Sequence, residues 1–139
     1  MSEPRWEHFP HGADIGIRGV GPTMASAFEQ VALALTAVLT DPSSVASKEG
    51  VELACEASTA DELLYAWVDA LIYEMSTRGM LFGAYEVKID GVRLRARALG
   101  ETVDRARHEP AIEVKAPTYT ELRVARVDDQ WVAQCVVDV

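Results

Sequence analysis

The sequence contains few of the features that would place a chain outside the cytoplasm. Its 139 residues include two cysteines, Cys55 and Cys135, which lie far apart and form neither a CxxC pair nor a zinc-site spacing. No apolar run approaches the roughly 20 residues that span a bilayer. The first six residues lack the basic segment, apolar stretch and cleavage site of a signal peptide. We therefore expect a cytoplasmic protein without a membrane segment, in which the cysteines are buried thiols.

Positive charge is also scarce, because 13 lysines and arginines stand against 22 aspartates and glutamates. The formal net charge of -9 argues against direct binding of RNA or DNA, since a phosphate backbone requires a basic surface. It is compatible with metal binding and with docking on a basic protein. The sequence has no P-loop, GxGxxG, HExxH or GxSxG segment and no complete catalytic constellation. We therefore do not expect an enzyme.

The hydrophobic pattern predicts one α+β domain over residues 1–139, with two helices packed on a mostly antiparallel β-sheet. The helices are expected over residues 23–40 and 59–79, where apolar stripes at 3.6-residue spacing follow threonine N-caps. Residues 100–110 are expected to form a polar connection. Alternating apolar residues predict strands over 6–9, 14–20, 48–56, 85–89, 92–98, 111–115, 119–127 and 130–137.

A hairpin between two of these strands is predicted at Asp90-Gly91, a strong two-residue turn signal. That turn would set Glu86 opposite Arg95 and direct Val92 into the core. The outward row Arg93, Arg95 and Arg97 is then explained by cross-strand pairing with acidic residues. A contact with phosphate or with an acidic partner is the alternative.

Acidic groups near the two ends of the sequence form the first candidate site. Asp14 opens a predicted strand after a bend, and Asp138 and Val139 end the last strand with a side-chain carboxylate beside an α-carboxylate. If the fold brings these groups together, their repulsion requires a cation, and oxygen ligands favour calcium, magnesium or manganese. Spacing alone does not establish that proximity, and capping a turn is the ordinary role of a lone aspartate.

Other candidates are weaker when each is taken alone. His11 precedes Asp14 and has a simple interpretation as a surface histidine. Lys115 lies between apolar neighbours on a predicted strand, where a lysine also serves to discourage edge-to-edge aggregation. Glu101 and His108 belong to the polar connection and could line a site, although a solvated loop is the more common explanation for such a composition.

Taken in order, these segments resemble the archease family over nearly the whole chain, from about residue 8 to residue 139. The family's opening His-Thr-Ala-Asp motif stands here at 11–14 with Gly12 in place of threonine. Its Val-Lys-Ala-x-Thr-Tyr block stands at 114–119, with Pro117 in place of the usual apolar residue. The family's other motifs match Ala27-Phe28-Glu29, Leu63-Leu64 with Trp67, Gly100-Glu101 leading to His108, and the closing Asp138-Val139.

The resemblance implies an α+β sandwich and an accessory role for an RtcB-type RNA ligase, which joins RNA ends in tRNA splicing and RNA repair. That ligase uses GTP and manganese to guanylylate its own histidine, and the family promotes this step and restores turnover. A divalent metal with oxygen ligands is implied, calcium first, with manganese or magnesium as functional alternatives. By motif match the metal ligands are Asp14, Asp138 and Val139, and the functional surface adds Lys115, His11, His108 and Glu101.

Two alternatives stay open. The same carboxylates could tie the ends of the chain together in a metal-binding chaperone or scaffold for another client protein. A metal-dependent hydrolase is the third possibility, because two carboxylates and a cation can activate water. The missing nucleophile or base makes that the least favoured of the three.

Overall fold

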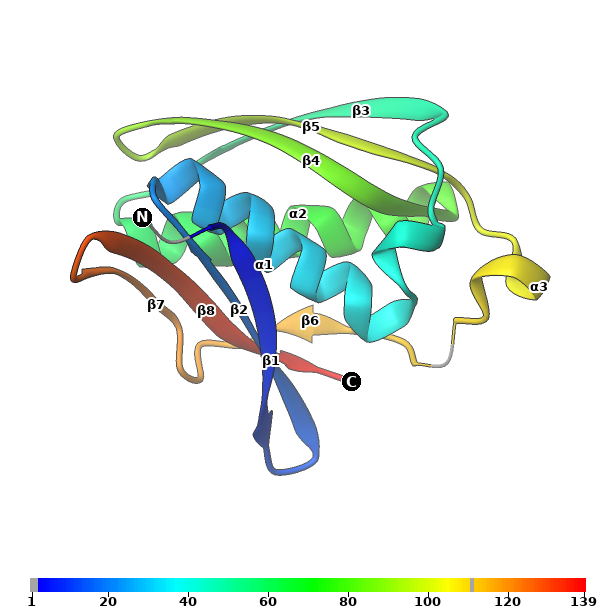
Figure 1. The fold of residues 1–139 in the computed structure, drawn as a ribbon, viewed down its shortest axis with the longest axis horizontal. Helices are drawn as coiled ribbons and strands as arrows, with labels where there is room; N and C mark the ends of the chain where they lie inside the picture. The colour runs from blue at the N-terminus through cyan, green and yellow to red at the C-terminus, as the bar shows by residue number, and fades with distance from the viewer. Residues whose placement is uncertain (1–2, 111) are drawn as a thin grey trace.

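In the computed structural model, which describes residues 3–110 and 112–139, two antiparallel sheets enclose two long helices (Figure 1). The elements are β1 Arg5–His11, β2 Asp14–Gly21, α1 Met24–Leu39, η1 Pro42–Ser44, β3 Glu49–Glu56, α2 Ala60–Arg78, β4 Met80–Asp90, β5 Arg93–Thr102, α3 Arg105–His108, β6 Ala116–Pro117, β7 Arg123–Val127 and β8 Gln130–Asp138. One sheet has the order β1-β2-β8-β6, with β7 also paired to β8, and the other has the order β3-β5-β4. The predicted α+β class is confirmed, and the predicted single sheet is divided in two.

Both long helices begin at the threonines that the sequence predicts. Thr23 Oγ accepts a hydrogen bond from the Ser26 backbone N–H at 3.0 Å, and Thr59 Oγ accepts one from the Glu62 N–H at 3.1 Å. Gly79 ends α2 in the left-handed region at φ +63°, which an L side chain adopts only with strain. The predicted apolar stripes form the core between the sheets: Phe28, Val31, Leu35, Leu64, Trp67, Val68 and Leu71 are buried.

The first strand is longer than the sequence predicts, because β1 continues through Pro10 to His11. β1 is the edge strand of its sheet, and an edge is where a proline, which lacks an N–H donor, is tolerated. The chain then reverses at Gly12, whose φ of +59° suits a residue without a Cβ. The resulting β1–β2 hairpin projects beyond the rest of its sheet (Figure 1).

The predicted β4–β5 turn is wrong by one residue. Asp90 stays in β4 and pairs with Arg93, so the turn consists of Gly91, at φ +61°, and Val92, which is 37% exposed. Glu86 therefore lies opposite Arg97, and no inward role remains for Val92. The basic row is nevertheless explained by acidic neighbours, since Arg93 and Arg97 form ion pairs with the β3 residues Glu56 and Glu52.

The segment between β5 and β8 is where the sequence prediction fails most. Residues 112–115 form no strand, residue 111 lies outside the described residues, and the pairing segment is β6, the next two residues along the chain. β7 starts at Arg123 instead of residue 119. The polar connection of 100–110 contains the end of β5 and the short helix α3. Short extended segments with few alternating residues carry too weak a pattern to be located.

The expectation of buried thiols without a disulfide is confirmed for Cys135 and only in part for Cys55. Both cysteines are free, and Cys135 is fully buried, which raises the pKa of its thiol to about 12. Cys55 is half-buried. Within the described part of the chain, none of the helices has both the length and the apolar character needed to cross a membrane.

Candidate functional site

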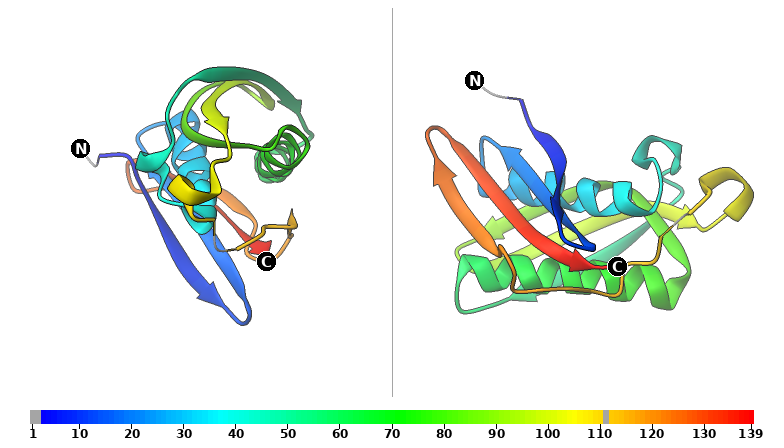
Figure 2. Two further views of the ribbon diagram at one scale, coloured as in Figure 1. Left: turned by 90° about the vertical axis from the view of Figure 1, so that its right-hand side faces the viewer. Right: turned by 90° about the horizontal axis from the view of Figure 1, so that it is seen from below.

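One end of the five-stranded sheet carries most of the predicted site residues. Asp14 is the first residue of β2 and Asp138 is the last residue of β8. The last paired positions of these two strands are Ile15 and Val137, so each aspartate is the next residue beyond that pair. From there the β1–β2 hairpin continues outward while β8 bends toward β6 (Figures 1 and 2). The two aspartates thus start from neighbouring positions, which the sequence alone did not establish.

Strand alternation directs both aspartate side chains away from the helices. Ile15 and Val137 pack toward the core, and successive residues of a strand point to opposite faces. Asp14 and Asp138, one position further along, therefore belong to the outer face of the sheet. His11 is paired with Asp14 across the hairpin and shares its face. Three of the predicted residues thus lie on one face at one end of this sheet.

Lys115 and Val139 lie at the same end of the sheet. The Lys115 backbone N–H donates a hydrogen bond to the Asp138 carbonyl at 2.8 Å, and its side chain is exposed. Ala116 is paired with Asp138 in β6. The Val139 side chain packs against the core, which holds the chain in place directly after Asp138. Lys115 is therefore fixed by its backbone to the strand that carries Asp138, although it is not itself in a strand.

The carboxylates at this end have no partner within the described residues. Neither Asp14 nor Asp138 accepts a hydrogen bond at its side chain or forms an ion pair there. Over residues 3–110 and 112–139, no group of three His, Cys, Asp or Glu side chains is arranged to hold a metal ion by itself. The donor chemistry fits a hard cation, because all the predicted ligands are oxygen atoms. Calcium and magnesium take six or more oxygen ligands, so this set is an incomplete coordination shell.

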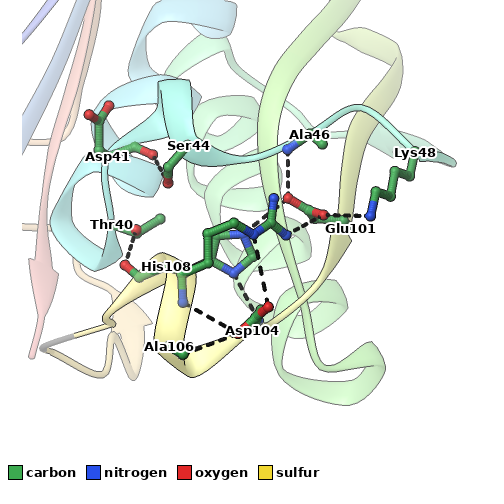
Figure 3. Close-up of polar contacts among 10 residues, drawn as sticks. Thr40, Asp41, Ser44, Ala46, Lys48, Glu101, Asp104, Ala106 and His108 are labelled. Carbon is green, nitrogen blue, oxygen red and sulfur yellow. Dashed lines mark hydrogen bonds and ion pairs between the residues drawn. The ribbon is translucent and has the colours of Figure 1, made fainter.

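Glu101 and His108 form a separate cluster, where β5, α3 and the segment before β3 meet (Figure 3). The Glu101 carboxylate is only 3% exposed and is surrounded by donors. It accepts from the Ala46 N–H at 2.7 Å and from Arg107 at 2.6 Å, and Lys48 lies 3.5 Å away. The hydrogen bonds of Arg107 and then of Ala46 hold the pKa of the Glu101 carboxyl well below its usual range.

The hydrogen bonds of His108 define its tautomer. Its Nδ1 accepts from the Asp104 backbone N–H at 2.9 Å, so this nitrogen carries no proton. The Nε2 atom, 3.0 Å from the Glu101 carboxylate, must therefore be the N–H donor. Both ring nitrogens are occupied and the side chain is buried, which leaves neither of them for a metal or for proton transfer. Thr40 Oγ donates to the carbonyl of His108 and ties α3 to the end of α1.

The predicted functional surface thus falls into two parts. His11 and Lys115 are exposed at the sheet end with the aspartates, whereas Glu101 and His108 are buried in the second cluster. A partner that binds near the second cluster would meet the exposed Lys48 and Arg107, which the buried carboxylate holds in place. The sequence alone does not indicate that Lys48 and Arg107 share the Glu101 carboxylate, because the three segments involved lie up to about sixty residues apart.

Comparisons of the whole chain agree on one family. A model of the archease protein family matches residues 6–139. The archease of Thermococcus gammatolerans is 42% identical over 139 residues, covering 96% of this chain and 98% of the relative. The archease of Pyrococcus furiosus is also 42% identical, over 140 residues, covering 97% of this chain and 99% of the relative.

Solved structures lead to the same family. The solution structure of protein 1598 of Methanobacterium thermoautotrophicum superimposes with a TM-score of 0.86 at 33% identity, covering 96% of this chain and 98% of that one. A crystal structure from Thermotoga maritima, described as an archease and possible chaperone, gives a TM-score of 0.60 at 20% identity. It covers 100% of this chain and 98% of that one, and at this identity it supports the fold alone.

Proposed function

Because this chain belongs to the archease family, we propose that it activates an RtcB-type RNA ligase. In this proposal it promotes the GTP- and metal-dependent guanylylation of the ligase and so its multiple turnover in tRNA splicing or RNA repair. The observation that carries the proposal is a pair of carboxylates, those of Asp14 and Asp138. They lie just beyond the last paired positions of β2 and β8 and have no partner within the described residues.

Asp14, Asp138 and the α-carboxylate of Val139 would hold the cation, which is calcium, manganese or magnesium. When bound, a divalent cation neutralises charge on phosphate oxygens during nucleotidyl transfer. The residues of this chain would bind and orient the ion and leave part of its coordination shell to the partner or to water. Lys115, fixed to the same strand end, would add a positive charge for a phosphate group.

The charge of the protein suits a protein partner better than RNA. A net charge of -9 favours docking over the basic mouth of an RNA-processing enzyme and disfavours direct contact with an RNA backbone. The ligase would then bind the RNA, and this protein would act on the ligase in the cytoplasm.

The direct test is ligase turnover with GTP and manganese, measured with and without this protein. Wild type should raise the number of RNA ends joined per ligase molecule, and Asp14→Ala and Asp138→Ala should lose most of that stimulation while melting as wild type does. Asp129→Ala removes an exposed carboxylate from the β7–β8 turn and serves as the matched control. No stimulation by wild type would contradict the proposal, and full stimulation by both alanine variants would remove its metal-site mechanism.

The contribution of the α-carboxylate has its own test. Residues appended after Val139 move the carboxylate away from the sheet end without altering either aspartate. We expect such an extension to weaken stimulation of the ligase. Full stimulation with a long extension would exclude the α-carboxylate as a ligand and leave the two aspartates in place.

A metal-binding chaperone or scaffold for another client is the second candidate, favoured by the description of the Thermotoga maritima relative as a possible chaperone. A genome that encodes this protein but no RtcB-type ligase would favour it. Hydrolysis of simple phosphoesters by the pure protein would favour the third candidate, a metal-dependent hydrolase. His108 cannot serve as the general base of that candidate, because it is buried and both of its ring nitrogens are in hydrogen bonds.

A further inference from the structure

The turn that follows β6 is hydrogen-bonded to β8 at Val136, two residues before Asp138. The carbonyl of Val136 accepts two hydrogen bonds from one residue, from the Thr118 N–H at 2.9 Å and from the Thr118 hydroxyl at 2.8 Å. The Val136 N–H in turn donates to the Thr120 carbonyl at 3.1 Å. Both backbone groups of Val136 are therefore bonded to the turn 118–120.

The same turn is anchored on its other side to α2. The ring of Tyr119 stacks on the ring of Tyr65 with 4.4 Å between centroids and an angle of 5° between planes. Tyr119 is otherwise 71% exposed, so this stack is the main contact of its side chain. The turn 118–120 thus connects a long, capped helix to the strand that carries the proposed metal ligands.

Thr118 supplies bonds that its neighbour cannot make. Pro117, which pairs with Val137, has no N–H to donate. The bonds to β8 on either side of it come from Lys115, to the Asp138 carbonyl, and from Thr118, to the Val136 carbonyl. The last residues of a strand open readily unless such bonds hold them.

We propose that Thr118 is a positioning residue for the metal ligands, and that its hydroxyl holds the end of β8 so that Asp138 and Val139 stay beside Asp14 and Lys115. This inference rests on the proposed function, because it concerns the same ligand set. In this inference Thr118 is not itself a metal ligand. Its hydroxyl acts through the carbonyl of Val136, two residues from the first ligand of that strand.

The test compares three variants of the full chain. Thr118→Val keeps the shape and removes the hydroxyl, and Thr118→Ser restores a hydroxyl at the same position. Thr40→Val is the matched control, because Thr40 Oγ also donates to a backbone carbonyl, that of His108, in the separate Glu101 cluster (Figure 3). Calcium affinity is measured by calorimetry, and exchange of the Lys115 amide hydrogen by nuclear magnetic resonance without metal.

Thr118→Val removes the bond that the hydroxyl donates to the Val136 carbonyl and also the bond that it accepts from the Thr120 N–H at 3.2 Å. The loss of one such hydrogen bond already changes a local opening equilibrium by about fivefold. We therefore expect the Lys115 amide to exchange at least about fivefold faster in Thr118→Val and calcium to bind about fivefold more weakly. Thr118→Ser and Thr40→Val should lie within about twofold of wild type in both measurements, even where Thr40→Val lowers the melting temperature.

Each other outcome overturns a definite statement. Wild-type calcium affinity in Thr118→Val overturns the inference, as does a Thr118→Ser variant that binds as weakly as Thr118→Val. Equal weakening by Thr40→Val would show a general effect of stability instead of positioning. If wild type binds no calcium, manganese or magnesium, the metal mechanism of the proposed function fails, and the inference fails with it. If wild type binds calcium and Thr118→Val binds it equally well, only the inference about Thr118 fails and the proposed metal site is unaffected.

Discussion

Two groups of acidic side chains in this protein have similar sequence signatures and opposite environments. At the sheet end, Asp14 and Asp138 stand at the ends of strands, and their side chains have no hydrogen bond or ion pair within the described residues. At the other site, the single carboxylate of Glu101 is buried and bonded to a backbone N–H, a histidine and an arginine. Both groups lie in segments that match the family motifs. Membership of a motif therefore does not distinguish a residue that binds a ligand from one that stabilises the fold.

The hydrogen-bond partners and the burial of a polar residue in a family motif indicate whether it stabilises the fold or is available to a ligand. A buried carboxylate whose oxygens are all occupied stabilises the fold, and removing a partner leaves unsatisfied groups behind. A solvent-accessible carboxylate without a partner, such as that of the exposed Asp138 or the half-buried Asp14, contributes little to stability and remains available to a ligand. We therefore assign Glu101 and His108 to the architecture and the aspartates to the proposed function, and the predictions below test this division.

The largest loss of stability is expected for His108→Ala. The substitution leaves an oxygen of Glu101 and the Asp104 N–H without their partner and opens a cavity in a buried position. We expect the free energy of unfolding, measured by urea denaturation, to fall by about 2–4 kcal/mol. Thr40→Val, which removes a hydrogen bond to the same segment, should cost about 1 kcal/mol. A smaller loss for His108→Ala than for Thr40→Val would contradict the structural role of the histidine.

The pH dependence of stability should report Glu101. Because the folded state holds the pKa of this carboxyl below its ordinary 4.5, ionised Glu101 stabilises the fold above about pH 4.5. That contribution is lost as the pH falls from 4.5 toward the lower pKa of the folded state. Glu101→Gln lacks this titration, so the difference in unfolding free energy between wild type and variant should shrink as the solution is acidified. A difference that stays constant from pH 7 to pH 3 would exclude Glu101 as its source.

Local signals in the sequence located the helices accurately and the short strands poorly. The caps at Thr23, Thr59 and Gly79 depend on neighbouring residues only, and all three are found where the sequence predicts them. The β4–β5 turn lies one residue later than predicted. Gly91 fits the second position of an Asp90-Gly91 turn and also the first position of the observed Gly91-Val92 turn. β6 pairs through two residues, and nothing in its own sequence indicates that β8 lies beside it.

The residues proposed for the candidate site come from the family resemblance, whereas their arrangement could not be predicted from the sequence. The family resemblance selected Asp14, Asp138 and Lys115, and their meeting at one sheet end depends on pairing between strands more than a hundred residues apart. Resemblance could not separate Glu101 from that set, since its burial arises from contacts among three distant segments. Thr118 belongs to the Val-Lys-Ala-x-Thr-Tyr block, but only the structure shows that it donates two hydrogen bonds to the Val136 carbonyl.

A moderate effect is expected for Tyr119→Ala. It removes the stack on Tyr65, and aromatic pairs of this kind contribute about 0.5–1.5 kcal/mol. Since the stack anchors the turn 118–120, the exchange of the Lys115 amide should also become faster. Tyr73→Ala is the control, because Tyr73 is a comparably exposed tyrosine of α2 without such a stack within the described residues. Equal exchange rates of the Lys115 amide in the two variants would show that the Tyr65–Tyr119 stack does not stabilise the end of β8.

The smallest effect on the free energy of unfolding is expected for substitutions of the two aspartates at the sheet end, in contrast to substitutions in the Glu101 cluster. Asp14→Asn and Asp138→Asn remove a charge and keep the size of each side chain, and no partner within the described residues is left unsatisfied. The unfolding free energy without metal should stay within about 0.5 kcal/mol of wild type, and relief of repulsion between two neighbouring carboxylates can raise it. With calcium present, wild type should melt at a higher temperature and the variants should not, because only a folded state that binds the ion is stabilised by it. A variant that loses stability without metal, as His108→Ala does, would place its aspartate among the structural groups.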